Sequence, residues 1–243
     1  MPARTFALIM AGGVGARMGA DIPKQFITVH DKPIIAYTLE RFQRHPEIDA
    51  IGVVCVEGWG DVVERYAREY GISKLEWVIP GGASYLDSIR EGVYHLEGEL
   101  GEDDLVLVHN SVQPMLDAEV VSDALRVARA HGAAVSALPY NDQLYVVDAD
   151  DPASTTHPLE RGTLRRVTTP NVYRFGLIDA AYHRVEDEGI DVSGISGICV
   201  MMATLGTRLH FAAGSEKNIK ITTKDDIVTF KAFLRDNDET TAR

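Results

Sequence analysis

The sequence predicts an α/β protein whose core is a doubly wound, mainly parallel β-sheet. Short apolar runs rich in β-branched residues alternate with amphipathic segments of helical period along most of the chain. This alternation is typical of strand–helix–strand units, in which each helix carries the chain back to start the next parallel strand. The first apolar run ends in a glycine cluster, at the edge where such sheets bind ligands.

The elements follow in chain order from the residue pattern. Strands are predicted where apolar and β-branched residues are consecutive, at residues 6–10, 51–56, 77–79, 105–109 and 133–138. Helices are predicted where apolar residues recur at intervals of three and four, at 32–43, 60–70, 84–96 and 117–131. The pattern ends with a helix at 176–188, a strand at 209–212 and a closing helix at 224–234.

The alternation breaks between residues 139 and 168. An apolar stretch at 144–147 is followed by the sequence D-A-D-D-P-A-S-T-T-H-P and then by charged residues. Proline, aspartate and serine at this density favour turns, so we expect a hairpin or arm that leaves the main sheet. We expect one domain over residues 1–235 and a polar, frayed tail over 236–243.

Composition limits the partners that the chain can take. Its formal net charge of −12 would repel nucleic acid and anionic membranes, so neither is expected as a partner. An anionic substrate would therefore need a local positive pocket. Cys55 and Cys199 lie in apolar runs, as buried reduced thiols do, and no run approaches the roughly 20 apolar residues of a membrane span. We expect a soluble, cytoplasmic protein.

The sequence A-G-G-V-G-A-R-M-G after the first strand is the strongest functional feature. Gly12, Gly13 and Gly15 permit backbone angles closed to other residues and let N–H groups approach anionic oxygens. Arg17 and Lys24 would supply positive charge beside them. A glycine-rich turn can also serve the fold alone, and the segment matches neither the Walker A pattern nor the dinucleotide fingerprint. The two cations favour a polyphosphate site.

A second cluster, N-I-K-I-T-T-K-D-D, starts at Asn218. Lys220 follows a short strand-like element and could direct its charge at a phosphate, although such a lysine is often only a solvated surface charge. Asp226 could bind Mg²⁺, which prefers carboxylate and phosphate oxygens. Thr223 and Asp226 also fit the S/T-x-x-D/E capping pattern, so both interpretations of Asp226 stay open.

Two further groups stand out in the second half of the chain. His109 precedes Asn110 and Gln113 in H-N-S-V-Q-P at a strand end, where a structural, hydrogen-bonded histidine is favoured over a catalytic base. Arg161 and Thr169 could hold a second phosphate, although an arginine on an arm also suits a subunit interface.

Taken in order, these clusters resemble the cytidylyltransferases that act on 2-C-methyl-D-erythritol 4-phosphate and their relatives that act on D-ribitol 5-phosphate. The similarity runs from about residue 6 to residue 234, and its most specific pieces are A-G-G-x-G-x-R-M-G with P-K-Q-F, G-G-A-S with D-S-I, and N-I-K-I-T-x-x-D-D. The resemblance implies a Rossmann-like nucleotidyltransferase fold with a protruding β-arm and a homodimer joined by that arm. It also implies CTP, Mg²⁺ and a polyol phosphate as ligands.

The same resemblance implies roles for single residues. The set that would bind CTP is Ala11, Gly12, Gly13, Gly15, Gly82, Ser88 and Asn110, in which Gly82 and Ser88 would recognise the cytidine. The set that would neutralise phosphate charge in catalysis is Arg17, Lys24 and Lys220. Arg161, reaching from the partner subunit, and Thr169 would hold the phosphate of the acceptor. Asp226 and Asn110 would be the metal ligands.

Several stretches depart from the family pattern. The family reads H-D-A-A-R-P or H-D-S-V-R-P, and H-N-S-V-Q-P here replaces a metal-binding acid by Asn110 and a pocket arginine by Gln113. Tyr85 stands where the family pattern has a further arginine. The D-T-x-K motif is D-Q-L-Y at residues 142–145, and a T-D-D-like segment is V-S-G at 192–194. Weaker binding of Mg²⁺ and a changed acceptor would follow.

The leading hypothesis is transfer of CMP from CTP to a polyol phosphate with release of pyrophosphate. D-Ribitol 5-phosphate is the favoured acceptor, on the strength of S-V at 111–112 and Q-F at 25–26. The alternative acceptor is 2-C-methyl-D-erythritol 4-phosphate, of the isoprenoid precursor pathway. A different class of function, a catalytically attenuated nucleotide-binding homologue, rests on the changes at Asn110, Gln113 and Tyr85. A last alternative keeps the reaction but takes another nucleoside triphosphate.

Overall fold

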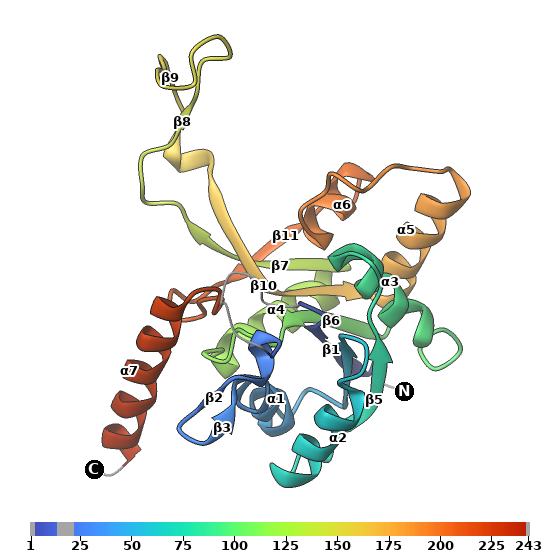
Figure 1. The fold of residues 1–243 in the computed structure, drawn as a ribbon. Helices are drawn as coiled ribbons and strands as arrows, with labels where there is room; N and C mark the ends of the chain where they lie inside the picture. Colours follow the sequence, from blue (N-terminus) through green and yellow to red (C-terminus); the bar gives the residue numbers. More distant parts are fainter. Residues whose placement is uncertain (1–2, 14–21, 242–243) are drawn as a thin grey trace.

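A seven-stranded sheet forms the centre of the molecule (Figure 1). The computed structural model describes residues 3–13 and 22–241. The strand order is β11–β7–β10–β6–β1–β4–β5, and every neighbouring pair is parallel except the two pairs made by β10. The strands are β1 (Thr5–Ala11), β4 (Ala50–Cys55), β5 (Leu75–Pro80), β6 (Leu105–Asn110), β7 (Ala133–Pro139), β10 (Arg165–Arg174) and β11 (His210–Ala213). The doubly wound, mainly parallel sheet is confirmed.

Side chains alternate between the two faces of the sheet along each strand, so both faces are apolar and helices cover both. On β1, Ala7 and Ile9 belong to one apolar core, whereas Phe6 and Leu8 belong to the other. The first core is closed by α1 (Ile34–Arg44), α2 (Gly60–Glu69) and α4 (Ala118–His131). The second is closed by α3 (Tyr85–His95), α5 (Phe175–Asp187) and α6 (Ile198–Thr204).

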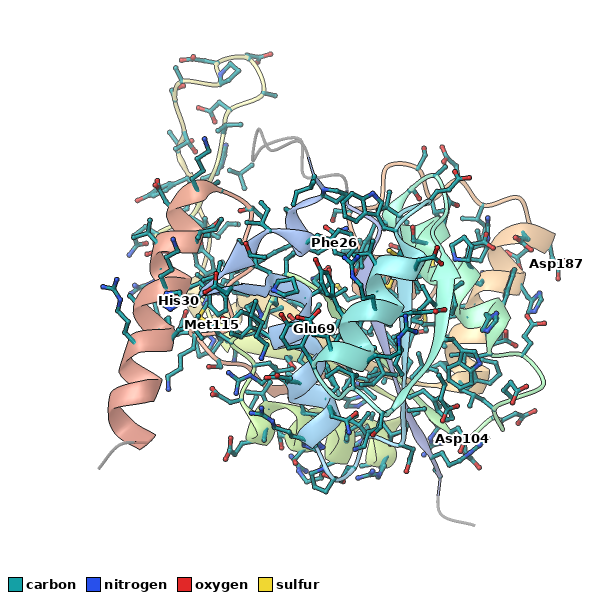
Figure 2. All side chains as sticks on the ribbon, turned by 60° about the horizontal axis from the view of Figure 1, so that its bottom comes forward. Phe26, His30, Glu69, Asp104, Met115 and Asp187 are labelled. Atoms are coloured by element: carbon teal, nitrogen blue, oxygen red, sulfur yellow. The ribbon has the colours of Figure 1, made fainter. Side chains whose placement is uncertain are left out.

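A third apolar cluster attaches the last helix, α7 (Lys224–Thr241), to the rest of the molecule. Phe230 of α7 is buried, and its ring meets Tyr37 of α1 edge-on with centroids 5.1 Å apart. Met115, labelled in Figure 2, belongs to the same cluster. The short elements η2 (Lys24–Phe26), β2 (Thr28–Val29) and β3 (Lys32–Pro33) lead from the glycine segment into α1.

The arm expected between the two halves of the sequence is present. Its tip is a hairpin in which β8 (Tyr145–Val146) pairs antiparallel with β9 (His157–Pro158), followed by the short helix η3 (Arg161–Thr163). In Figure 1 the hairpin stands well away from the sheet. Tyr145 and Val147 are 54% and 58% exposed, so this chain alone does not cover the apolar side chains of the arm.

Three elements differ from the sequence-based prediction. Strand β10 was missed because Pro170 and several polar residues interrupt its apolar pattern; Pro170 lies where the register to β7 shifts, between Val167 and Asn171. Helix α6 was missed because it is short. The last helix, α7, extends past its predicted end at Leu234 to Thr241, because no glycine or proline follows Leu234 to end it. Among the described helices, none combines the length and the apolar character needed to cross a membrane.

Gly92 shows how closely α3 packs on the sheet, and it gives a test of the fold. A Cβ on Gly92 would lie 2.6 Å from Leu8 Cδ2 and 3.0 Å from Val54 Cγ2. We expect Gly92→Ala to lower the free energy of unfolding by about 1–2 kcal/mol, since overpacking outweighs the better helix propensity of alanine. Urea denaturation would measure it.

The matched control is Gly60→Ala at the start of α2, where the new Cβ would make only an ordinary 3.5 Å contact with Val78 Cγ1. This variant should be neutral or more stable by up to about 1 kcal/mol. Equal effects of the two substitutions would contradict the close packing of α3 on β1 and β4.

Candidate active site

Two cavities adjoin at the carboxyl ends of β1 and β6. The first has a volume of about 450 Å³ and lies between the glycine segment, η2 and the start of α3. The second has a volume of about 590 Å³ and lies between β10, α6 and the segment before α7. Tyr85, Asn110 and Lys220 line both cavities. A molecule in one cavity would therefore meet a molecule in the other at these three side chains.

The glycine segment forms part of the first cavity. Gly12 and Gly13 directly follow β1 and line the cavity, as the sequence predicts. A Cβ on Gly12 would lie 3.4 Å from Ser88 Oγ, so the loop passes close to α3. Ala11 ends β1 and is buried in the sheet, and it does not line the cavity. Gly15 and Arg17 lie outside the described residues.

The opposite wall of this cavity is the start of α3, with the loop before it. Ser84 and Asp87 form a reciprocal capping box, and Ser88 Oγ donates to Ser84 O at 2.8 Å and accepts from Gly82 N at 3.1 Å. A Cβ on Gly82 would lie 2.5 Å from Asp87 Cβ, so only glycine fits there. Gly82 and Ser88, predicted to recognise the nucleotide, are thus held in one hydrogen-bonded turn.

The helix η2 places Lys24 in the first cavity. Gln25 Nε2 donates to Ala11 O at 2.6 Å, which ties η2 to the end of β1. Phe26, labelled in Figure 2, is buried and stacks on Trp59 with ring centroids 4.4 Å apart. Lys24 itself lines the cavity and donates from Nζ to Ile221 O at 3.0 Å. Gln25 also lines the cavity, and sequence reasoning gave it no role.

Lys220 lies at the junction of the two cavities. Its neighbour Ile221 is fully buried and donates its N–H to Val112 O at 2.9 Å, which fixes this segment against the end of β6. Lys220 Nζ lies 5.9 Å from the ring centroid of Tyr85. Burial raises the pKa of Tyr85 to about 12, so its phenol stays protonated and uncharged at neutral pH. Lys220, the cation predicted from the sequence, lies where molecules in the two cavities would meet.

Asp226 serves as a helix cap. Its Oδ2 accepts hydrogen bonds from the backbone N–H and the hydroxyl of both Thr222 and Thr223, at 2.8–3.0 Å. Burial opposes ionisation of Asp226, but these hydrogen bonds outweigh it and hold the pKa of the carboxyl below its usual value. Asp226 lines neither cavity, whereas Thr222 lines the first. One carboxylate oxygen of Asp226 thus caps α7, and its role as a metal ligand stays a prediction.

A network of uncharged side chains separates the second cavity from the core. Gln113 Oε1 accepts from Asn110 Nδ2 at 2.6 Å and from Thr169 Oγ1 at 2.9 Å. Gln113 Nε2 donates to Thr168 Oγ1 at 3.2 Å and to Asn218 O at 3.1 Å. All hydrogen-bonding atoms of the Gln113 amide are thus engaged. The two residues that depart from the family pattern, Asn110 and Gln113, form one neutral pair.

His109 is structural, as the sequence favoured. It is fully buried, and its Nε2 donates to Gln113 O at 3.0 Å. Burial lowers the pKa of His109 to about 4, so the imidazole stays neutral at physiological pH. It lines neither cavity, and it contacts the ring of Phe42 edge-on.

The phosphate-holding residues predicted on the arm are separated by the fold. Thr169 lines the second cavity, but Arg161 is exposed on η3 and donates to Asn141 O at 2.9 Å. Within one chain, Arg161 therefore does not reach the cavity that Thr169 lines. Arg166, on the same strand as Thr169, lines that cavity and forms an ion pair with Glu216. Sequence reasoning missed Arg166, since nothing distinguished it from the other arm arginines.

Sequence comparisons match almost the whole chain to one family. The family model described as IspD, 2-C-methyl-D-erythritol 4-phosphate cytidylyltransferase, matches residues 5–236. A ribitol-5-phosphate cytidylyltransferase of Lacticaseibacillus paracasei is 45% identical over 232 residues, which cover 96% of this chain and 98% of the relative. A 2-C-methyl-D-erythritol 4-phosphate cytidylyltransferase of Geobacter metallireducens is 36% identical over 242 residues, with coverage of 95% and 97%.

Solved structures share the fold. The crystal structure of 4-diphosphocytidyl-2C-methyl-D-erythritol synthase from Anaerococcus prevotii superposes with a TM-score of 0.80 at 24% identity, covering 96% of each chain. A second structure of a 4-diphosphocytidyl-2C-methyl-D-erythritol synthase gives 0.78 at 22% identity, covering 96% of this chain and all of the other. With a family match over almost its whole length, the chain belongs to the IspD family, the 2-C-methyl-D-erythritol 4-phosphate cytidylyltransferases.

Proposed function

We propose that this protein transfers CMP from CTP to a polyol phosphate, with D-ribitol 5-phosphate as its acceptor, and releases pyrophosphate. The observation that carries the proposal is the pair of adjoining cavities with Lys220 at their junction. The 45% identity to a ribitol-5-phosphate cytidylyltransferase favours ribitol phosphate over methylerythritol phosphate. The alternative acceptor, 2-C-methyl-D-erythritol 4-phosphate, is the one named for the 36% identical relative.

The first cavity would hold CTP. Backbone N–H groups of Gly12 and Gly13 suit the phosphates, and Lys24 supplies charge on the same side. Gly82 and Ser88 form the wall proposed to recognise the cytidine. Gly15 and Arg17, which lie outside the described residues, are proposed as further phosphate contacts.

The reaction needs no protein nucleophile. An oxygen of the acceptor's phosphate attacks the α-phosphorus of CTP, a new P–O bond forms, and the bond to pyrophosphate breaks. A phosphate monoester is largely a dianion at neutral pH, so no general base is required, in keeping with the buried, neutral His109. Lys220 would stabilise the charge that develops on the α-phosphate, and the two cavities would hold the reactants in line.

Mg²⁺ is proposed as the metal cofactor, carried mainly by the triphosphate. The amide oxygen of Asn110 is an uncharged ligand of the kind Mg²⁺ accepts, and Asn110 lines the CTP cavity. Asp226 is proposed as the second metal ligand through Oδ1, because Oδ2 accepts the hydrogen bonds that cap α7. When bound, the ion would neutralise phosphate charge. Among the described residues, the carboxylate–histidine group Glu97, Asp179 and His183 lies on the surface and lines neither cavity.

The second cavity would hold the acceptor, with Thr169 and Arg166 beside its phosphate. We further propose a homodimer joined through the arm, because its exposed apolar side chains would be covered by a second copy. Arg161 of the partner subunit would then add a cation at the acceptor phosphate. The net charge of −12 argues against nucleic acid and membrane as partners. Two free cysteines suit a reducing, cytoplasmic location.

The activity is tested by pyrophosphate release from CTP and Mg²⁺ with ribitol 5-phosphate, methylerythritol 4-phosphate and glycerol 3-phosphate in parallel. We expect release with ribitol 5-phosphate at a kcat/KM at least about tenfold above the other two, because a mismatched acceptor loses transition-state contacts. Parallel assays with UTP, ATP and GTP test the base. Higher activity with methylerythritol phosphate would show that the alternative acceptor is the substrate. Activity only with another nucleoside triphosphate would show that CTP is not the nucleotide substrate.

The role of Lys220 is tested by Lys220→Ala. We expect kcat to fall at least about 100-fold with an unchanged Tm, because the side chain is exposed and acts on the reacting phosphate. Lys217→Ala is the matched control, since Lys217 is an exposed lysine on the same segment that lines neither cavity. Near-normal turnover of Lys220→Ala would remove Lys220 from the mechanism.

Asn110→Asp distinguishes an active neutral site from an attenuated one. Aspartate cannot donate to Gln113 Oε1, so the variant should lose about 1–3 kcal/mol of stability and gain no activity. Its Mg²⁺-dependent rate and its denaturation midpoint would be measured together. A large gain in the Mg²⁺-dependent rate would instead support the second candidate function, a nucleotide-binding homologue with attenuated catalysis, which the changes at Asn110 and Gln113 favour.

A further inference from the structure

Two residues that line the second cavity carry buried amide oxygens that lack hydrogen-bond partners in the described part of the chain. They are Oδ1 of Asn171, on β10, and Oδ1 of Asn218, in the segment before Lys220. Both residues line the cavity, and they are only 4% and 5% exposed. Buried carbonyl oxygens are nearly always paired, because leaving one unpaired destabilises the folded state.

The orientation of the Asn218 amide is set by its other end. Asn218 Nδ2 donates to Thr169 O at 2.5 Å, and a backbone carbonyl can only accept, so Oδ1 must be the atom that stays unpaired. Asn218 O in turn accepts from Gln113 Nε2. The network around Gln113 therefore holds Asn218 in place while leaving its side-chain oxygen unsatisfied.

The chemistry of the cavity defines the group that these oxygens fit. An amide oxygen only accepts hydrogen bonds, so the ligand must present donors. Two neutral acceptors suit uncharged donors such as hydroxyls. Among the described residues, Glu216 is the one carboxylate that lines the cavity; it forms an ion pair with Arg166 and so is not offered to a cationic ligand. Asn110 and Gln113 add no charge.

We propose that Asn171 and Asn218 accept hydrogen bonds from hydroxyls of the polyol chain, and that Asn171 determines acceptor specificity, because Asn218 lies in the N-I-K-I-T motif that the resemblance shares with the methylerythritol phosphate enzymes. The proposal rests on the proposed function, in which this cavity holds the polyol phosphate. Ribitol phosphate carries a hydroxyl on every carbon that does not bear the phosphate, whereas methylerythritol phosphate has a shorter chain with a methyl branch. Ribitol phosphate therefore has one hydroxyl more than methylerythritol phosphate, and a buried oxygen that accepts from this additional hydroxyl would favour ribitol phosphate.

The test pairs a protein change with a ligand change. Asn171→Leu has nearly the same shape and lacks the oxygen; Asn171→Ala is the smaller second variant if leucine does not fit. Binding of ribitol 5-phosphate and of its singly deoxygenated analogues is measured by calorimetry in the presence of α,β-methylene-CTP and Mg²⁺. Pyrophosphate release is measured with CTP in parallel.

We expect Asn171→Leu to weaken binding of ribitol 5-phosphate on the order of tenfold or more, with CTP affinity unchanged. Wild type should bind one deoxygenated analogue about as weakly as the variant binds ribitol 5-phosphate. The variant should bind that analogue and ribitol 5-phosphate equally well. The Tm of the variant should stay equal or rise, because an unpaired buried oxygen is removed. A residue with a purely structural role would lower the Tm instead.

Ser136→Ala is the matched control. The Ser136 hydroxyl is also buried without a partner among the described residues, but it lies on β7 and lines neither cavity. Its removal should leave both ligand affinities unchanged.

The outcomes separate this inference from the proposed function. The inference is overturned if Asn171→Leu binds ribitol 5-phosphate with unchanged affinity, or if wild type binds every deoxygenated analogue equally well. If wild type still releases pyrophosphate in that case, the proposed function stands. Binding with the expected pattern but no pyrophosphate release supports the inference and overturns the function. Absence of polyol phosphate binding by wild type overturns both.

Discussion

The Gln113 side chain is the constraint on which the rest of the site depends. Its four hydrogen bonds join the end of β6, through Asn110, to β10, through Thr168 and Thr169, and to the segment that carries Asn218. Those elements come from three distant parts of the sequence. Because Lys220 follows Asn218 by two residues, the same hydrogen bonds also fix the position of the cation between the two cavities.

A neutral network has a different cost from a charged one. A buried acid–arginine pair must recover the hydration energy of two charges, whereas a fully satisfied amide network carries only the cost of ordering its dipoles. Asn110 and Gln113 satisfy each other and leave the surrounding surface without added charge. Lys24 and Lys220 then supply positive charge to the first cavity, in a protein whose overall charge is strongly negative. A local cationic pocket in an acidic molecule confines anionic ligands to that pocket.

The exceptions to hydrogen-bond satisfaction occur at the cavity wall. Asn171 and Asn218, which line the cavity, keep unpaired oxygens, while Gln113, which donates to Asn218 O, has none. Unsatisfied groups at functional sites exchange stability of the free protein for interactions with a ligand.

The sequence by itself determined the fold class, most strand and helix positions, the arm and the family, because these depend on local periodicity and on motifs that are contiguous in the chain. It also identified Gly12, Lys24, Gly82, Ser88 and Lys220, which lie in such motifs. Only the tertiary structure decided that Asp226 caps α7, that Arg166 rather than the same chain's Arg161 lines the second cavity, and that Asn171 and Asn218 share its wall. Strand β10 was also decided there, because its pairing with β6 and β7 overrides a weak local pattern. These outcomes depend on contacts between segments far apart in the sequence, and periodicity carries no information about such contacts.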